Sequence, residues 1–196
     1  MNALPRTEGH LTVEEYLAIE EASDIRHEFV NGEVHALAGA SEKHQTIILN
    51  IATALRGPAR DRGCRVLLDG LKLQVAEKFI YYPDVMVNCD PTDDDPYVKQ
   101  TASLVVEVLS PTTATTDRRE KPLFYLQLPS LLCYMIVFQD EQRVELRWGP
   151  DVDSDWHFEV VAHRPVKIPG LDLELRLEEI YEGVEAGPAG STEWPR

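Results

Sequence analysis

The sequence has no long apolar segment. In its 196 residues no apolar run approaches the roughly 20 residues that cross a bilayer. The first ten residues, MNALPRTEGH, contain no cationic segment followed by an apolar stretch, so we expect no secretory signal. These two absences predict a cytoplasmic protein with no membrane partner.

Cysteine is scarce. The chain has 3 cysteines, Cys64, Cys89 and Cys133, which are widely spaced and lie among apolar neighbours. Their odd number and the lack of a CxxC pair argue against a disulfide framework and against a cysteine metal site. We therefore predict that all three are reduced residues of the core.

Positive charge is also in short supply, with 19 basic against 34 acidic side chains and a formal net charge of −15. Nucleic-acid-binding proteins usually present a basic face, because phosphate contacts supply much of their affinity. The composition argues against tight, non-specific DNA binding. It does not exclude a nuclease, because acidic clusters can lie far from the site and a bound metal changes the local charge.

Several catalytic motifs are missing. The chain has no glycine-rich phosphate loop, and its histidines lack zinc-site spacing. Ser103 and Ser110 are not flanked by the glycines of a nucleophile elbow. The acidic run DPTDDDP (90–96) lacks the ligand spacing and closing glutamate of a calcium hand, so we expect a solvent-facing loop there.

Local patterns predict the first two elements of the chain. Residues 11–21, LTVEEYLAIEE, are typical of a short helix in which Thr12 and Glu15 form a capping box. Two β-prone arms then surround Asn31 and Gly32, a dipeptide that favours the left-handed backbone of a tight turn. We predict a helix followed by a β-hairpin.

The rest of the chain is consistent with one α/β domain. Ser41 opens a helix with one apolar stripe, which Gly57 and Pro58 should end or kink. We expect a single domain over 1–185 and a disordered tail over 186–196. Strands are predicted within 64–75, 79–89, 103–110 and 131–139, a helix within 117–128, a hairpin within 142–162, and a strand with a closing helix within 168–184.

Two acidic residues interrupt apolar strands. Asp84 lies in YYPDVMV, and Glu107 lies in LVVEVLS. An isolated buried carboxylate is costly, so such residues are usually paired, hydrogen-bonded or bound to a cation. On neighbouring strands the two could hold a hard divalent cation. The alternatives are that Asp84 caps backbone amides and that Glu107 forms a buried salt bridge.

The position of a catalytic lysine follows from strand parity. Glu107 and Leu109 point to the same face, and Leu109 fills the position of the lysine in the nuclease motif PD…(D/E)-x-K. The nearest substitute is Lys121, which a helix beside the strand could direct back at the carboxylates. Such an ammonium could orient water or stabilise charge on a phosphate. Outside this context, Lys121 would be a solvated helix lysine.

With these residues in place, the chain resembles the Uma-two family of endonucleases, a branch of the PD-(D/E)XK restriction-endonuclease-like superfamily. The resemblance runs from about Leu11 to Tyr181 and follows one order of motifs. The matching features are LTVEEYLAIEE, HEFVNGEV, His44 early in the next helix, YYPDVMV, LVVEVLSPTT, and DRREK followed by Tyr125.

The resemblance implies a fold and a site. The fold would be a restriction-endonuclease-like mixed central sheet flanked by helices, with an N-terminal β-hairpin. Asp84, Glu107 and the main-chain carbonyl of Val108 would bind Mg²⁺ or Mn²⁺, and Lys121 would be the migrated catalytic lysine. Many enzymes of this architecture act as dimers, so the resemblance also suggests a homodimer.

Two further residues are secondary candidates. Glu28, in the first hairpin arm, could line the site or be an exposed cross-strand partner. His44 is either a hydrogen-bonded structural histidine or a member of the site.

Pro122 directly follows Lys121 and is unusual inside a helix. Either the helix starts near Arg119, which puts Pro122 in the tolerant first turn, or Lys121 is displaced from the site.

Three functional hypotheses follow. The leading one is a metal-dependent endonuclease that hydrolyses phosphodiester bonds in DNA, with Asp84, Glu107 and Lys121 as catalytic residues. The second is a catalytically silent interaction module in which the same three residues form a structural ion-pair cluster. The third is a phosphoesterase for small phosphorylated substrates, which would need a closed pocket rather than an open groove.

Overall fold

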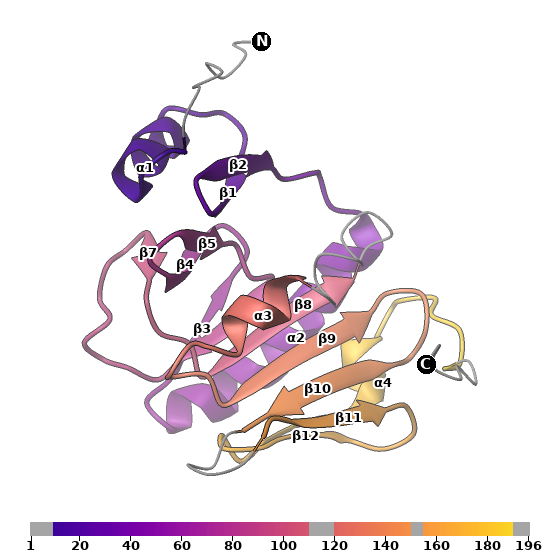
Figure 1. Ribbon diagram of the computed structural model, residues 1–196. Coiled ribbons are helices and arrows are strands. Elements are labelled where there is room, and N and C mark those ends of the chain that lie inside the picture. Colours follow the sequence, from indigo (N-terminus) through magenta and orange to yellow (C-terminus); the bar gives the residue numbers. More distant parts are fainter. Residues whose placement is uncertain (1–9, 110–119, 150–154, 190–196) are drawn as a thin grey trace.

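A six-stranded mixed sheet forms the centre of the protein in the computed structural model, which describes residues 10–109, 120–149 and 155–189 (Figure 1). The strand order is β11-β10-β9-β8-β6-β3. β8 and β9 are parallel, and the other neighbouring pairs are antiparallel. The bounds are β3 Arg65–Leu68, β6 Val85–Asn88, β8 Leu104–Leu109, β9 Cys133–Phe138, β10 Val144–Trp148 and β11 His157–Val161.

A second sheet of five strands has the order β2-β1-β5-β4-β7. Its first two strands form the predicted hairpin, in which Asn31 and Gly32 have φ values of 50° and 92°. The hairpin prediction is confirmed, because these two residues take the left-handed backbone that a tight turn needs. The bounds are β1 His27–Val30, β2 Glu33–Ala36, β4 Lys72–Ala76, β5 Phe79–Tyr81 and β7 Val98–Lys99, and a separate hairpin pairs β12 Val166–Ile168 with β13 Leu173–Leu175.

Four helices accompany the sheets in the described part of the chain: α1 Val13–Glu21, α2 Glu42–Asp61, α3 Lys121–Tyr125 and α4 Leu177–Ile180. The capping box of Thr12 and Glu15 is present at the start of α1, as predicted. Ser41 caps α2 through its side chain. Among the described residues, no helix has both the length and the apolar character needed to cross a membrane.

Of the two predicted outcomes at Gly57 and Pro58, an end or a kink, the end is wrong, since α2 continues through Pro58 to Asp61. A proline near the end of a helix removes one backbone hydrogen bond. Leu55 and Ala59, on either side of Pro58, are buried in the core. Their packing holds the last turn of the helix, so tertiary contacts outweigh the local signal.

The two faces of the central sheet carry different cores. On one face, Val106 and Val108 pack with apolar residues of α2. On the other face, Val105 and Leu109 pack with Tyr125 of α3. The side-chain parity predicted for this strand is therefore confirmed, and Glu107 belongs to the face that α3 covers. The mixed sheet with helices on both faces confirms the predicted fold class.

The cysteine prediction needs correction, because Cys64 and Cys89 form a disulfide. Arg65 pairs with Asn88 in the β3–β6 ladder, so the two cysteines lie opposite each other one position beyond it, with their Cα atoms 4.1 Å apart. The linear sequence did not reveal this strand pairing. Cys133 is a free, buried cysteine, as predicted.

The predicted start of the C-terminal tail at residue 186 is too early. The Gly187 amide donates a hydrogen bond to the Asp140 carbonyl, and the Gln142 amide donates one to the Gly187 carbonyl. These contacts join residues around 187 to the turn between β9 and β10. The remainder of the predicted tail, 190–196, lies outside the described residues.

Candidate functional site

Asp84 and Glu107 come together where β6 and β8 lie side by side. Val85 pairs with Val106 in this antiparallel ladder, so the two acids stand at the next position on each strand. The Val108 amide donates a hydrogen bond to Asp84 Oδ2 over 2.6 Å. The structure thus contains the backbone contact expected of a capping aspartate, and it also brings both carboxylates to one place.

Lys121 contacts Glu107, as the displaced-lysine prediction requires. Its Nζ lies 3.2 Å from Glu107 Oε1, and the Tyr125 hydroxyl donates to the same oxygen over 2.9 Å. Glu107 and Lys121 are only 2% and 5% exposed. The buried salt bridge considered as an alternative for Glu107 is therefore present, and Lys121 is not a solvated helix lysine.

Pro122 occupies the first turn of α3, where a missing amide hydrogen is tolerated. Of the two alternatives, the one that puts Pro122 in the tolerant first turn is confirmed, and Lys121 remains in contact with Glu107. Arg119 itself lies outside the described residues.

Glu28 is a buried member of the same cluster. It pairs with His35 in the hairpin, but it is only 7% exposed, so the alternative of an exposed cross-strand partner is wrong. Its Oε1 lies 2.9 Å from Lys121 Nζ. The lysine is therefore placed between carboxylates from two different sheets.

His44, in the first turn of α2, lies on the other side of Asp84. Its Nε2 is 3.3 Å from Asp84 Oδ2. Burial lowers the pKa of His44, but the hydrogen bond and charge of Asp84, together with the Val108 backbone, outweigh burial and leave the pKa above its usual value. The histidine therefore joins the site through Asp84.

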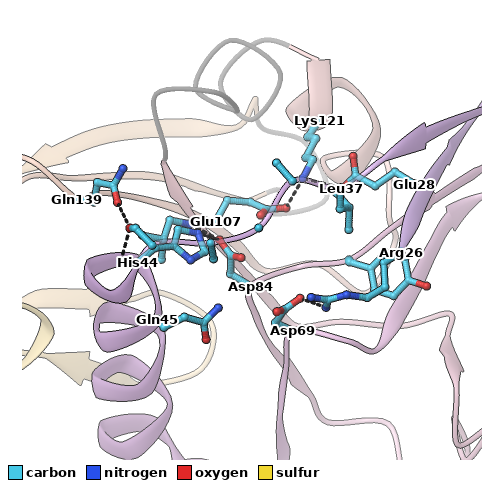
Figure 2. Close-up of a pocket in the computed structure, with 16 residues that line it drawn as sticks. Arg26, Glu28, Leu37, His44, Gln45, Asp69, Asp84, Glu107, Lys121 and Gln139 are labelled. Carbon is cyan, nitrogen blue, oxygen red and sulfur yellow. Dashed lines mark hydrogen bonds and ion pairs between the residues drawn. The ribbon is translucent and has the colours of Figure 1, made fainter. Parts of the chain in front are cut away.

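These residues line one pocket of about 340 Å³, shown in Figure 2. The sequence did not identify all of the lining residues, and Arg26 and Asp69 were among those missed. These residues reach the pocket only through the arrangement of the two sheets in the fold. The described lining residues are Arg26, Glu28, Leu37, Ala38, Gly39, Ala40, Ser41, His44, Gln45, Asp69, Tyr82, Asp84, Glu107, Val108, Lys121 and Gln139.

The donor set suits a hard cation that keeps part of its water shell. Asp84, Glu107 and Val108 all line the pocket, and one or two carboxylates are what Mg²⁺ takes from proteins. Within the described residues, no group of three or more histidine, cysteine, aspartate or glutamate side chains is placed to hold a metal. A divalent cation in this pocket would thus have two carboxylates, a main-chain oxygen and water as ligands.

The chain is similar in sequence to two proteins of one cyanobacterial strain. The chain is 32% identical over 177 residues to the uncharacterized protein slr1290 of Synechocystis sp. (strain ATCC 27184 / PCC 6803 / Kazusa), covering 89% of this chain and 93% of that protein. It is 36% identical over 139 residues to the uncharacterized protein sll1609 of the same organism, covering 69% of this chain and 78% of that protein.

A solved structure has the same fold. It is described as the crystal structure of "a putative nuclease belonging to DUF820" from Anabaena variabilis ATCC 29413, and it superposes with a TM-score of 0.70 at 17% identity, covering 87% of this chain and 97% of that one. The Uma2 family model, described as "Putative restriction endonuclease", matches residues 13–178. Since this match spans most of the chain, the protein belongs to the Uma2 family.

Proposed function

We propose that this protein is a metal-dependent endonuclease that hydrolyses phosphodiester bonds in DNA. The observation that carries the proposal is that Asp84, which directly precedes β6, Glu107 of β8 and Lys121 of α3 line one pocket. Membership of a family described as a restriction endonuclease supports a nuclease activity.

Mg²⁺ or Mn²⁺ would be held by Asp84, Glu107 and the main-chain carbonyl of Val108. When bound, the metal supplies Lewis-acid stabilisation of the charge that builds on the phosphoryl oxygens. Asp84 is oriented for this by the Val108 amide, and Glu107 by the Tyr125 hydroxyl. Both carboxylates therefore need little reorganisation when a cation enters.

Lys121 would place its ammonium beside the reacting phosphate. Glu28 and Glu107 hold Nζ from two sides, at 2.9 and 3.2 Å. Two carboxylates favour the charged form of a buried amine. A protonated Lys121 can hydrogen-bond to the attacking water or to a phosphoryl oxygen, and stabilise charge that develops there. Glu28 would act as a positioning residue for this lysine.

A specific observation favours a second candidate, the catalytically silent interaction module. Lys121 already has acidic partners at salt-bridge distance in the protein alone. A structural ion-pair cluster would keep these same contacts and would have no need of a metal. The two candidates differ in whether the pocket binds a divalent cation.

Calorimetric titration with Mn²⁺ tests the proposal. The wild type should bind about one ion per chain, and folded Asp84→Ala and Glu107→Ala variants should lose this binding. Asp94→Ala is the matched control, because it removes one exposed carboxylate of the acidic loop that does not line the pocket.

A wild type that binds Mn²⁺ and cuts DNA, with cutting lost in Lys121→Ala, would support the endonuclease. A folded wild type that binds no Mn²⁺, with or without DNA, would leave the ion-pair module as the function. We also propose a homodimer in which each subunit cuts one strand. The molar mass from light scattering tests this assembly.

A further inference from the structure

Arg26 is the one arginine among the described residues that line the pocket. It precedes β1, and 46% of its side chain is exposed. Figure 2 shows Arg26 and Asp69 on one side of Asp84, with His44 and Gln139 on the other. The pocket therefore extends from His44, past Asp84, to Arg26.

The partner of this guanidinium is easily exchanged. Arg26 pairs with Asp69, and 26% of the Asp69 side chain is exposed. Surface ion pairs of this kind contribute little free energy, because water competes for both groups. The Asp69 amide donates a hydrogen bond to the Asp84 carbonyl over 3.0 Å, so this pair is tied directly to the chain segment that carries Asp84.

A fixed aromatic ring supports the guanidinium. Arg26 Cζ lies 5.8 Å from the ring centroid of Tyr82, and Lys72 Nζ lies 5.5 Å from the same centroid. The Tyr82 hydroxyl donates to Glu20 over 2.7 Å, which holds the ring in place. Of these two cations, Arg26 lines the pocket, and it does so beside the carboxylate of Asp69.

The guanidinium of Arg26 is chemically suited to bind a phosphate group. A guanidinium presents its N–H groups as a planar fork, which suits two oxygens of a phosphate, and it is more weakly hydrated than an ammonium. A phosphate that entered beside Arg26 would take the place of the Asp69 carboxylate on the same donors.

We propose that Arg26 binds a second phosphate of the substrate, adjacent to the scissile one. The inference rests on the proposed nuclease function and deepens it. A site with two phosphate positions selects a polynucleotide strand, which carries successive phosphates, over a small diester that carries one. The same position separates this protein from a phosphoesterase for small substrates.

The test compares kcat/KM with Mn²⁺ for two substrates, a short single-stranded oligodeoxynucleotide and bis(4-nitrophenyl) phosphate. Arg26→Ala should lower kcat/KM about tenfold more for the oligonucleotide than for the small diester. It should also reduce the slope of log kcat/KM against log salt for the oligonucleotide by about 0.7, the value for one phosphate contact on a single strand. Arg26→Lys should fall between the two, because it keeps the charge and loses the fork.

Arg60→Ala is the matched control, since Arg60 forms an exposed pair with Asp61 and does not line the pocket. This variant should leave kcat/KM for both substrates, and the salt dependence of kcat/KM for the oligonucleotide, unchanged. Equal losses on the two substrates in Arg26→Ala, or no loss on the oligonucleotide, would overturn the second phosphate position and leave the nuclease proposal standing. A wild type that hydrolyses neither substrate would overturn both.

Discussion

Among the described residues, two lysines are buried beside acidic side chains or an acidic loop, and their partners differ. Lys121, 5% exposed, lies between the side-chain carboxylates of Glu28 and Glu107 at the pocket. Lys99, 3% exposed, is the last residue of β7, and its Nζ donates to the main-chain carbonyls of Asp93 and Asp95 in the acidic loop, 90–96. The Lys121 side chain lines the pocket, whereas the Lys99 ammonium is hydrogen-bonded to the backbone of the acidic loop.

The comparison shows that the number of acidic residues does not identify a cation site. The loop is richer in aspartate, but Asp93 accepts hydrogen bonds from Asn88, Gln100 and Thr101. The prediction of a solvent-facing loop over 90–96 is confirmed for most of the loop, because all of its residues are exposed except Asp90 and Asp93, which are half-buried. The loop also borders a hollow, of about 440 Å³. Asp93 there is hydrogen-bonded by the segments on either side of the loop, whereas Glu107 shares its pocket with the ammonium of Lys121.

The largest expected effect comes from Lys121→Met. In the folded variant, kcat for DNA cleavage with Mn²⁺ should fall about a thousandfold, because a donor to the developing charge is lost. The metal-free protein should also lose about 3 kcal/mol of stability, since buried carboxylates are left without their cation. Steady-state kinetics and urea unfolding measure the two effects. An undiminished kcat would contradict a catalytic role for this lysine.

Lys99→Met should separate stability from activity. The carbonyls of Asp93 and Asp95 lose a buried donor, which should cost about 2 kcal/mol in the free energy of unfolding. The kcat for DNA should not change, because Lys99 does not line the pocket. Urea unfolding and the same cleavage assay test this variant. A loss of kcat in a folded protein would break the distinction between the two lysines.

Tyr125→Phe removes a donor to Glu107 and keeps the buried ring. The affinity for Mn²⁺ should fall about tenfold, as is usual when a residue that orients a metal ligand is changed. Tyr181→Phe is the control, since the Tyr181 hydroxyl lies within hydrogen-bond distance of the backbone carbonyls of Phe138 and Arg143 and does not line the pocket. Calorimetry should show a weaker site in the first variant only. Equal Mn²⁺ affinities would assign Tyr125 to packing alone.

The smallest expected effect is the pH dependence of the acidic loop. Burial raises the pKa of Asp93, but hydrogen bonds from Thr101, Gln100 and Asn88 outweigh burial and leave the pKa below its ordinary value. A carboxyl whose pKa is lowered in the folded protein stabilises the fold at pH values above its pKa in the unfolded chain, about 3.9. This contribution is lost as the pH falls through the pKa of the folded protein.

Asp93→Asn should therefore unfold more easily than the wild type at pH 7, by about 1 kcal/mol. The difference should shrink in acid, below about pH 4, where the wild-type carboxyl is protonated. Urea unfolding at several pH values measures this trend. A difference that does not depend on pH would show that the charge of Asp93 contributes nothing to the stability of the loop.

Local signals in the sequence predicted much of the fold and the centre of the site. Thr12 and Glu15 form their capping box, and Asn31 and Gly32 form their turn, because both depend on neighbours a few residues away. Glu107 could be assigned to a buried strand because apolar residues surround it. The family motif around Glu107 then identified Lys121 as the candidate for the displaced lysine.

The tertiary structure decided which residues share a surface. Glu28 reaches Lys121, Cys89 reaches Cys64, and the Pro58 turn holds because elements far apart in the sequence pack together. The hydrophobic periodicity within a segment does not predict such contacts, since each contact depends on which elements become neighbours in the fold. Arg26 reached the pocket in the same way, through the meeting of the two sheets.

The sequence by itself therefore determined the elements, the buried acids and the family pattern, because periodicity and turn chemistry act over short distances. Only the tertiary structure decided that Lys121 lies between Glu28 and Glu107, while Lys99 donates to a main-chain carbonyl of the acidic loop. The physical reason is that the cost of a buried charge depends on partners that folding brings from distant segments.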